Sequence, residues 1–427
     1  MYKEKLVDKS NLRKYALKEK KPIIEILFSK LGHLSKKNNT SYTLLAVCPN
    51  SENVLKAALR SAKRSNAPIK FAATLNQVDI DGGYTGWTQH DLVKKIKEES
   101  YKIGYNGPII IAVDHGGPWL KDIQRIEKWS LNKALSWIKK SFEEALLAGY
   151  DLIHIDPTVD IFNKDIKIEV VVDRTIELVS HTEKFRKLKK LKPISYEVGT
   201  EEVHGGLADM ELFNKFLSLL KIKLKKTKLE YLWPIFIVAK VGTDLHTTRF
   251  DSSTAKEVVK IVSRYGSYIK GHYTDFVENP EDYPKSGIGA ANVGPEFTMV
   301  EYNAFQELIG LEKRLFKGKK NTNLSRFKET LTNAVINSGR WEKWLLCDEK
   351  NFDSLSEERK DWILQTSCRY IWTNPDVNHA KLKLYNNLEL NGIDAEDWIL
   401  MKIESSIDKY YRAFNLININ EKIDNIL

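Results

Sequence analysis

Three histidines each follow a short apolar run that is typical of a β-strand. His115 ends the run IIIAVDH, His246 ends FIVAKVGTDLH, and His272 ends YIKGH. Parallel-barrel enzymes build their active sites at the C-terminal ends of the strands, where side chains from several strands converge. Three imidazoles can hold one divalent metal ion, such as Zn²⁺, and leave a coordination position open for substrate. The sequence therefore predicts a metal-dependent enzyme.

Asp114 stands directly before the first of these histidines and supplies a carboxylate that can transfer a proton. Neighbouring residues on a strand point to opposite faces, but the chain turns at a strand's end, so Asp114 and His115 can both reach the mouth of a barrel. Gly116 and Gly117 follow, and glycines let the backbone approach a ligand closely. We expect Asp114 to be the catalytic acid/base; the alternative is an ordinary hydrogen-bonded strand end.

Other polar side chains lie at or near the ends of further strand-like runs. His204 is a fourth imidazole candidate, and Glu197 is a possible carboxylate ligand. Polar groups at strand ends are where a sugar-like substrate is hydrogen-bonded, although such groups occur at strand ends in any barrel. The residues expected to contact substrate are Asn76, Gln77, Asp156, Glu197, His204 and Asn292.

These residues need a scaffold, and the sequence pattern predicts one. Strand-like and helix-like runs alternate in eight units over roughly 275 residues, which fits a (β/α)8 TIM barrel of the α/β class at residues 42–316. A doubly wound sheet is the alternative. Residues 1–41 are expected to form a helical lead-in. Residues 317–427, rich in Trp and Tyr, are expected to form a helical appendage that packs on the barrel or on another subunit.

Composition excludes several classes of protein. Hydrophobic residues make up 42% of the chain and charged residues 29%, as in a globular protein. The sequence has neither a membrane-spanning apolar run nor a signal-peptide core, and its three cysteines form no disulfide framework, so a cytoplasmic protein is expected. The net charge of +10 is spread along amphipathic segments, which argues against a nucleic-acid partner.

The motifs resemble a known family. The segments that carry the likeness are LNQVDIDGGYTGWT, AVDHGGP, LIHIDPT, YEVGTEEVHGG, GHYTDF, NVGPEFT and the aromatic runs RWEKWLL and RYIW. Together they are similar to the tagatose-bisphosphate aldolase Z-subunit family (GatZ/KbaZ-like) within the class II aldolase superfamily. The resemblance covers nearly the whole chain. It implies a TIM barrel and a zinc-dependent lyase that cleaves the C3–C4 bond of a ketose or ketose phosphate.

The resemblance also implies roles for individual residues. Asp114 matches the catalytic acid/base, while His115, His246 and His272 match the zinc ligands. Asn292 resembles the asparagine that contacts the ketose carbon skeleton. Thr247 and Tyr273, however, follow the second and third histidines where aldolases have a glycine and a GxSG-type loop, so the usual phosphate site is not expected.

The same resemblance leaves the reaction and the partner open. Some members of the wider family are regarded as ketose-phosphate 4-epimerases, which need the same metal site. The Z subunit itself is regarded as a non-catalytic protein that stabilises a partner aldolase subunit. A homo-oligomer is the other expected assembly, and the expected ligand is a sugar or sugar phosphate.

Overall fold

Eight short parallel strands close into a barrel in the computed structural model, which describes residues 6–163, 165–199, 210–239, 241, 243, 248–319 and 323–427. Each strand pairs with the next one in sequence order, and β1 pairs with β8. The predicted (β/α)8 barrel is confirmed, and the doubly wound alternative is wrong. The strands are β1 (Leu44–Val47), β2 (Ile69–Thr74), β3 (Ile109–Gly116), β4 (Leu152–Ile155), β5 (Ser195–Gly199), β6 (Phe236–Val238), β7 (Tyr268–Gly271) and β8 (Ala290–Val293).

Helices cover the outside of the barrel, and their ends are marked in the sequence. Ser51 and Thr88 cap α3 and α4 by accepting hydrogen bonds from backbone N–H groups, and Gly149 ends α6 at a φ of 98°. The segment after β4 is rich in β-branched residues yet forms a helix, which buries Val171 and Val172. The barrel helices are α3 (Glu52–Ser65), α4 (Gln89–Ile103), α5 (Asp122–Ile126), α6 (Leu131–Ala148), α7 (Ile168–Leu188), α8 (Met210–Lys226), η2 (Glu230–Leu232), α9 (Ser252–Ser263), α10 (Asp282–Lys285) and α11 (Pro295–Leu315).

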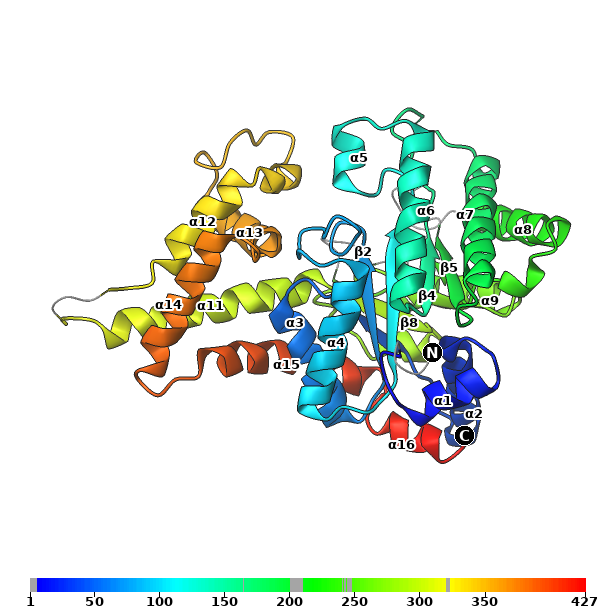
Figure 1. Cartoon of the computed structure of the whole chain (residues 1–427), viewed down its shortest axis with the longest axis horizontal. Helices are drawn as coiled ribbons and strands as arrows, with labels where there is room; N and C mark the ends of the chain where they lie inside the picture. Colours follow the sequence, from blue (N-terminus) through cyan, green and yellow to red (C-terminus); the bar gives the residue numbers. More distant parts are fainter. Residues whose placement is uncertain are drawn as a thin grey trace.

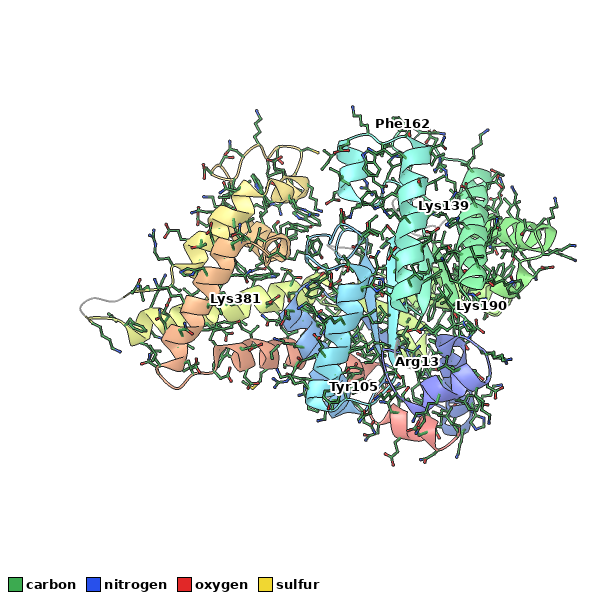
Figure 2. The ribbon with its side chains drawn as sticks, viewed as in Figure 1. Arg13, Tyr105, Lys139, Phe162, Lys190 and Lys381 are labelled. Carbon is green, nitrogen blue, oxygen red and sulfur yellow. The ribbon has the colours of Figure 1, made fainter. Side chains whose placement is uncertain are left out.

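Two N-terminal helices, α1 (Asn11–Lys18) and α2 (Ile23–Asn38), lie at one end of the barrel (Figure 1). Arg13 on α1 is fully buried there and is labelled in Figure 2. Its guanidinium forms ion pairs with Asp8, at 2.8 Å, and with Asp151, and donates a hydrogen bond of 2.5 Å to the carbonyl oxygen of Ile109. Asp151 directly precedes β4, so this cluster joins the N-terminal helices to the starts of β3 and β4.

The C-terminal part of the chain forms a helical lobe that begins where α11 leaves the barrel (Figure 1). Helix α15 runs back beside α11 and α3, and α16 lies against α1 and α2. Trp341 and Tyr370 are buried in the lobe, and Trp344, Trp362 and Trp372 are half-buried. The elements after α11 are α12 (Phe327–Asn337), η3 (Arg340–Trp344), α13 (Glu357–Ser367), η4 (Cys368–Tyr370), α14 (Pro375–Glu389), α15 (Ala395–Ala413) and α16 (Ile419–Asp424).

None of the helices in the described part of the chain combines the length and the apolar composition that a transmembrane segment requires.

Candidate functional site

The end of β3 departs from regular strand geometry at His115. The register between β3 and β4 shifts between Val113 and Gly116, and His115 adopts a φ of 46°, in the left-handed region. A bulge of this kind re-aims side chains, and non-glycine residues held at positive φ cluster at functional sites. The bulge explains how Asp114 and His115 both come to line the cavity at the barrel mouth.

Asp114 lines this cavity and is 3% exposed. The ammonium of Lys270 lies 2.7 Å from its Oδ1, and the amide of Asn292 donates a hydrogen bond of 2.9 Å to its Oδ2. Burial opposes ionisation of this carboxyl, but the charges of Lys270 and His115 outweigh it and hold the pKa of Asp114 well below its usual range. The side chain is therefore an oriented carboxylate anion.

Three imidazoles surround this carboxylate: His115, His154 and His272. The ring centroid of His115 lies 4.6 Å from that of His272 and 5.1 Å from that of His154. His115 Nδ1 lies 2.7 Å from Oδ2 of the buried Asp156, whose pKa falls to about 2 because hydrogen bonding and charge from His115 outweigh burial. A carboxylate behind one imidazole nitrogen fixes the ring and raises the basicity of the other nitrogen, as it does for metal-bound histidines.

Below the histidines, the barrel interior holds a chain of charges. Glu197 on β5 is fully buried and forms ion pairs with Lys70, at 3.2 Å, and with Lys270. Burial raises the cost of the Glu197 anion, yet the two lysines outweigh it and lower its pKa to about 2. Burial lowers the pKa of Lys70 to about 8 in spite of Glu197. Because Lys270 contacts both Asp114 and Glu197, it links the barrel interior to the mouth.

A metal ion fits part of this cluster by its donor chemistry. Asp114, His154, Glu197 and His272 each offer one ligand atom within 4.8 Å of the others, and all four residues are buried. Nitrogen and carboxylate donors together suit Zn²⁺ and similar divalent ions. The nitrogen of His154 that faces both carboxylates is Nδ1, 3.3 Å from Asp114 and from Glu197, and it also accepts a hydrogen bond from the backbone N–H of His115. The Lys270 ammonium contacts both carboxylates of this set, so the histidine nitrogens are the donors that carry the fit.

The other residues predicted from the sequence have definite places. The Asn76 side chain donates a hydrogen bond to the carbonyl oxygen of Leu120 and accepts one from the backbone N–H of Asp122. Gln77 Oε1 accepts a hydrogen bond from the backbone N–H of Thr74. Both line the mouth cavity, as does Asn292. Asp156 lies behind His115, and Glu197 lies in the barrel interior. The predicted metal ligand His246 and the predicted substrate contact His204 lie outside the described residues.

Sequence reasoning missed three residues of this centre: His154, Lys70 and Lys270. A signal was present, because strand residues two apart share a face. His154 is two residues before Asp156, and Lys270 is two residues before His272. A lysine inside the apolar runs IKFAAT and YIKGH is itself a sign of a charged barrel interior, since lysines are almost never fully buried without a partner.

The loop after β3 gives a test of this architecture. A Cβ atom added at Gly117 would lie 1.7 Å from the carbonyl oxygen of Asp156, so Gly117→Ala is expected to destabilise the fold by about 1–3 kcal/mol and to displace Asp156 from His115. Gly310 on α11 is the matched control: an added Cβ meets nothing within 4 Å, and Gly310→Ala should stabilise by about 0.5–1 kcal/mol. Urea unfolding of both variants measures the difference, and equal stabilities would contradict the packing described here.

Known proteins share the sequence pattern and the fold of this chain. The profile of the family described as D-tagatose-1,6-bisphosphate aldolase subunit GatZ/KbaZ-like matches residues 31–410. The crystal structure of a probable tagatose 6 phosphate kinase from Sinorhizobium meliloti 1021 is 19% identical, with a TM-score of 0.73 over 87% of this chain and 100% of that one. A fructose-bisphosphate aldolase from Campylobacter jejuni is 12% identical, with a TM-score of 0.51 over 92% of this chain and 94% of that one. At these identities the two structures share the fold. The family match confirms the resemblance seen in the sequence: the chain belongs to the GatZ/KbaZ-like family of D-tagatose-1,6-bisphosphate aldolase subunits.

Proposed function

We propose that this tagatose-bisphosphate aldolase-like protein is a metal-dependent lyase of the class II aldolase type, which cleaves the C3–C4 bond of a ketose or ketose phosphate. The observation that carries the proposal is Asp114, a buried and ionised carboxylate at the barrel mouth with three imidazoles around it. A base and a set of metal donors at the C-terminal ends of parallel strands are what such a reaction needs.

A divalent ion, Zn²⁺ first, is proposed at the histidines. His272 and His154 belong to the group of four close donors, and His115, whose ring centroid lies 4.6 Å from that of His272, is proposed as a further ligand beside that group. His246 remains a predicted ligand from outside the described residues. When bound, the ion supplies Lewis-acid polarisation of the oxygens on C2 and C3 of the ketose.

The chain's own residues support the proton transfer. As the C3–C4 bond breaks, Asp114 accepts the proton of the C4 hydroxyl, C4 leaves as an aldehyde, and the bonding electrons pass into the enediolate of C2 and C3. In the condensation direction Asp114 returns the proton. Asn292 and Lys270 hold the two oxygens of Asp114 in place, so the carboxylate is oriented before substrate binds.

A second candidate function is that of a non-catalytic subunit that stabilises a partner aldolase, and one observation favours it. Lys270 and Asn292 already occupy both oxygens of Asp114, and the lowered pKa makes this carboxylate a weak proton acceptor. A general base works best when its pKa lies near the working pH. A ketose-phosphate 4-epimerase would use the same residues as the lyase and differs only in the fate of the cleaved aldehyde.

One assay separates these functions. The full-length chain, supplied with Zn²⁺, is incubated with tagatose 1,6-bisphosphate or fructose 1,6-bisphosphate, and triose phosphate release is followed by NADH oxidation in a coupled assay. The proposal expects release by this chain alone. Release only after addition of a catalytic aldolase subunit supports the second candidate and overturns the first. Inversion at C4 without release, seen by NMR of the sugar, identifies the epimerase.

A further inference from the structure

The C-terminal lobe contributes side chains to the same cavity that holds Asp114. The cavity is lined by Lys343 and Trp344 of η3 and by Arg369 and Tyr370 of η4, together with Asp114. The cavity has a volume of about 330 Å³, which is the size range of small-molecule sites. A ligand that fills it therefore touches both the barrel and the lobe.

Arg369 is a buried cation of the lobe that lines this cavity. It is 9% exposed, and its Nε has no hydrogen-bond partner among the described residues. Its guanidinium carbon lies 5.4 Å from the ring centre of Trp344 and 5.2 Å from that of Tyr370, so two aromatic faces hold it in place. No ion pair joins it to a carboxylate in the described part of the chain. The Tyr370 hydroxyl accepts a hydrogen bond from this guanidinium, but a neutral oxygen does not replace the anion that a buried cation requires.

Two further cations and three carboxylates face the cavity. Lys343 Nζ lies 3.3 Å from Asp122, a carboxylate that Arg340 already contacts at 2.8 Å. Arg125 also lines the cavity, and its Nε donates a hydrogen bond to the carbonyl oxygen of Trp119. The remaining carboxylates are Asp114, which is paired with Lys270, and Asp275, which accepts bonds from the backbone N–H groups of Gly294 and Glu296. The carboxylates thus have their own partners, and the guanidinium groups of Arg369 and Arg125 keep donors for an anion.

We propose that Arg369, with Lys343 and Arg125, binds the phosphate group of a phosphorylated ketose whose carbon chain extends to Asp114. This assignment rests on the proposed function for the sugar part of the ligand. Arginine presents a planar fork of donors that matches phosphate oxygens, and hydrogen bonds to a charged phosphate are about twice as strong as neutral ones. A phosphate near pH 7 carries about 1.5 to 2 negative charges, which suits several cations better than one carboxylate does. The lobe is then the part of the protein that selects phosphorylated substrates.

The test uses binding of inorganic phosphate to the full-length protein, measured by isothermal titration calorimetry. Arg369→Gln should weaken phosphate binding by about 10-fold or more, the loss expected for one charged hydrogen-bonding group, and Lys343→Met by a smaller factor. Arg412→Gln is the matched control, since it removes one positive charge from an exposed position on α15 and should leave phosphate affinity unchanged. Acetate, a carboxylate probe, should bind more weakly than phosphate.

Each other outcome overturns the assignment. Equal phosphate affinity in Arg369→Gln and the unaltered protein, or no saturable binding by the unaltered protein, excludes a phosphate site at Arg369. Acetate binding as tightly as phosphate points instead to a sugar acid. If Arg369→Gln lowers the melting temperature, phosphate affinity is measured instead in Arg369→Lys and in Lys343→Met, whose side chain is exposed in the unaltered protein. Unchanged phosphate affinity in both variants overturns the assignment. Phosphate binding requires no turnover, so a failed aldolase assay leaves this result standing, and a failed binding test leaves the lyase proposal standing.

Discussion

Asp114→Asn is expected to lower the turnover of the proposed lyase by about 10²–10⁴-fold while the metal content stays near that of the unaltered protein. Asparagine has the size of aspartate and can still bond to Asn292, but it cannot take the C4 hydroxyl proton. His115→Ala should instead lose metal and activity together, because it removes a proposed ligand. Metal analysis of each purified variant, beside the triose phosphate assay, separates the two effects.

The control for this variant is Asp173→Asn, an exposed carboxylate on α7 that pairs with Lys223. It removes the same charge from an exposed position that does not line the cavity, and it should leave turnover and metal content unchanged. Full activity in Asp114→Asn on the true substrate would show that the carboxylate is not the base, and the non-catalytic candidate or a different base would take its place.

Arg13→Met is expected to cost about 3–5 kcal/mol of folding stability at neutral pH, because it removes the ion pair of the buried Asp8 and leaves the buried Asp151 to Lys192. Asp8 and Asp151 both lose their ion pairs with the guanidinium, and the carbonyl oxygen of Ile109 loses a donor. Urea unfolding measures the change. Lys14→Met is the control, because Lys14 is the exposed neighbour of Arg13 and its bond to Asn11 is long, at 3.4 Å.

The free energy of unfolding that Arg13→Met loses should depend on pH in one direction. Burial opposes ionisation of Asp151, but Arg13 and Lys192 outweigh it and keep its pKa below the ordinary value in the folded protein. The stabilisation that the ionised Asp151 gains from its ion pairs is complete above the ordinary aspartate pKa of about 4. It is lost as the pH falls through the lower pKa that Asp151 has in the folded protein. The stability gap between Arg13→Met and the unaltered protein should therefore narrow below about pH 4. A stability difference that stays constant below about pH 4 would mean that it does not come from the ion pairs of Arg13.

The alternation of apolar runs with amphipathic runs was enough to predict the barrel. Strand starts and helix caps such as Ser51 and Gly149 are local signals, and a parallel sheet follows from strands joined through helices. The return of α15 and α16 to the barrel could not be predicted in the same way. It depends on pairings of distant residues, such as the hydrogen bonds from the Tyr410 hydroxyl to Thr274 and Glu296, which no local pattern contains.

The site was predictable where a residue's place in its strand was enough. Asp114, His115 and His272 lie at strand ends and meet at the mouth, as expected. Asn76 and Gln77 also reach the mouth, but their side chains bond to the loops around them, and only side-chain packing could reveal this. Arg369 is about 250 residues from Asp114 in the sequence, so its place in the cavity depends on how the lobe packs.

The charged interior of the barrel has a consequence for the order of folding. Lys70 and Asp114 lie on β2 and β3, whereas their partners Glu197 and Lys270 lie on β5 and β7. A half-barrel of β1–β4 would have to bury one cation and one anion before either has its partner, and burying such groups unpaired is costly. Partial barrels are therefore disfavoured intermediates, and we expect the last strands to join in one cooperative, late closure that neutralises all four charges at once.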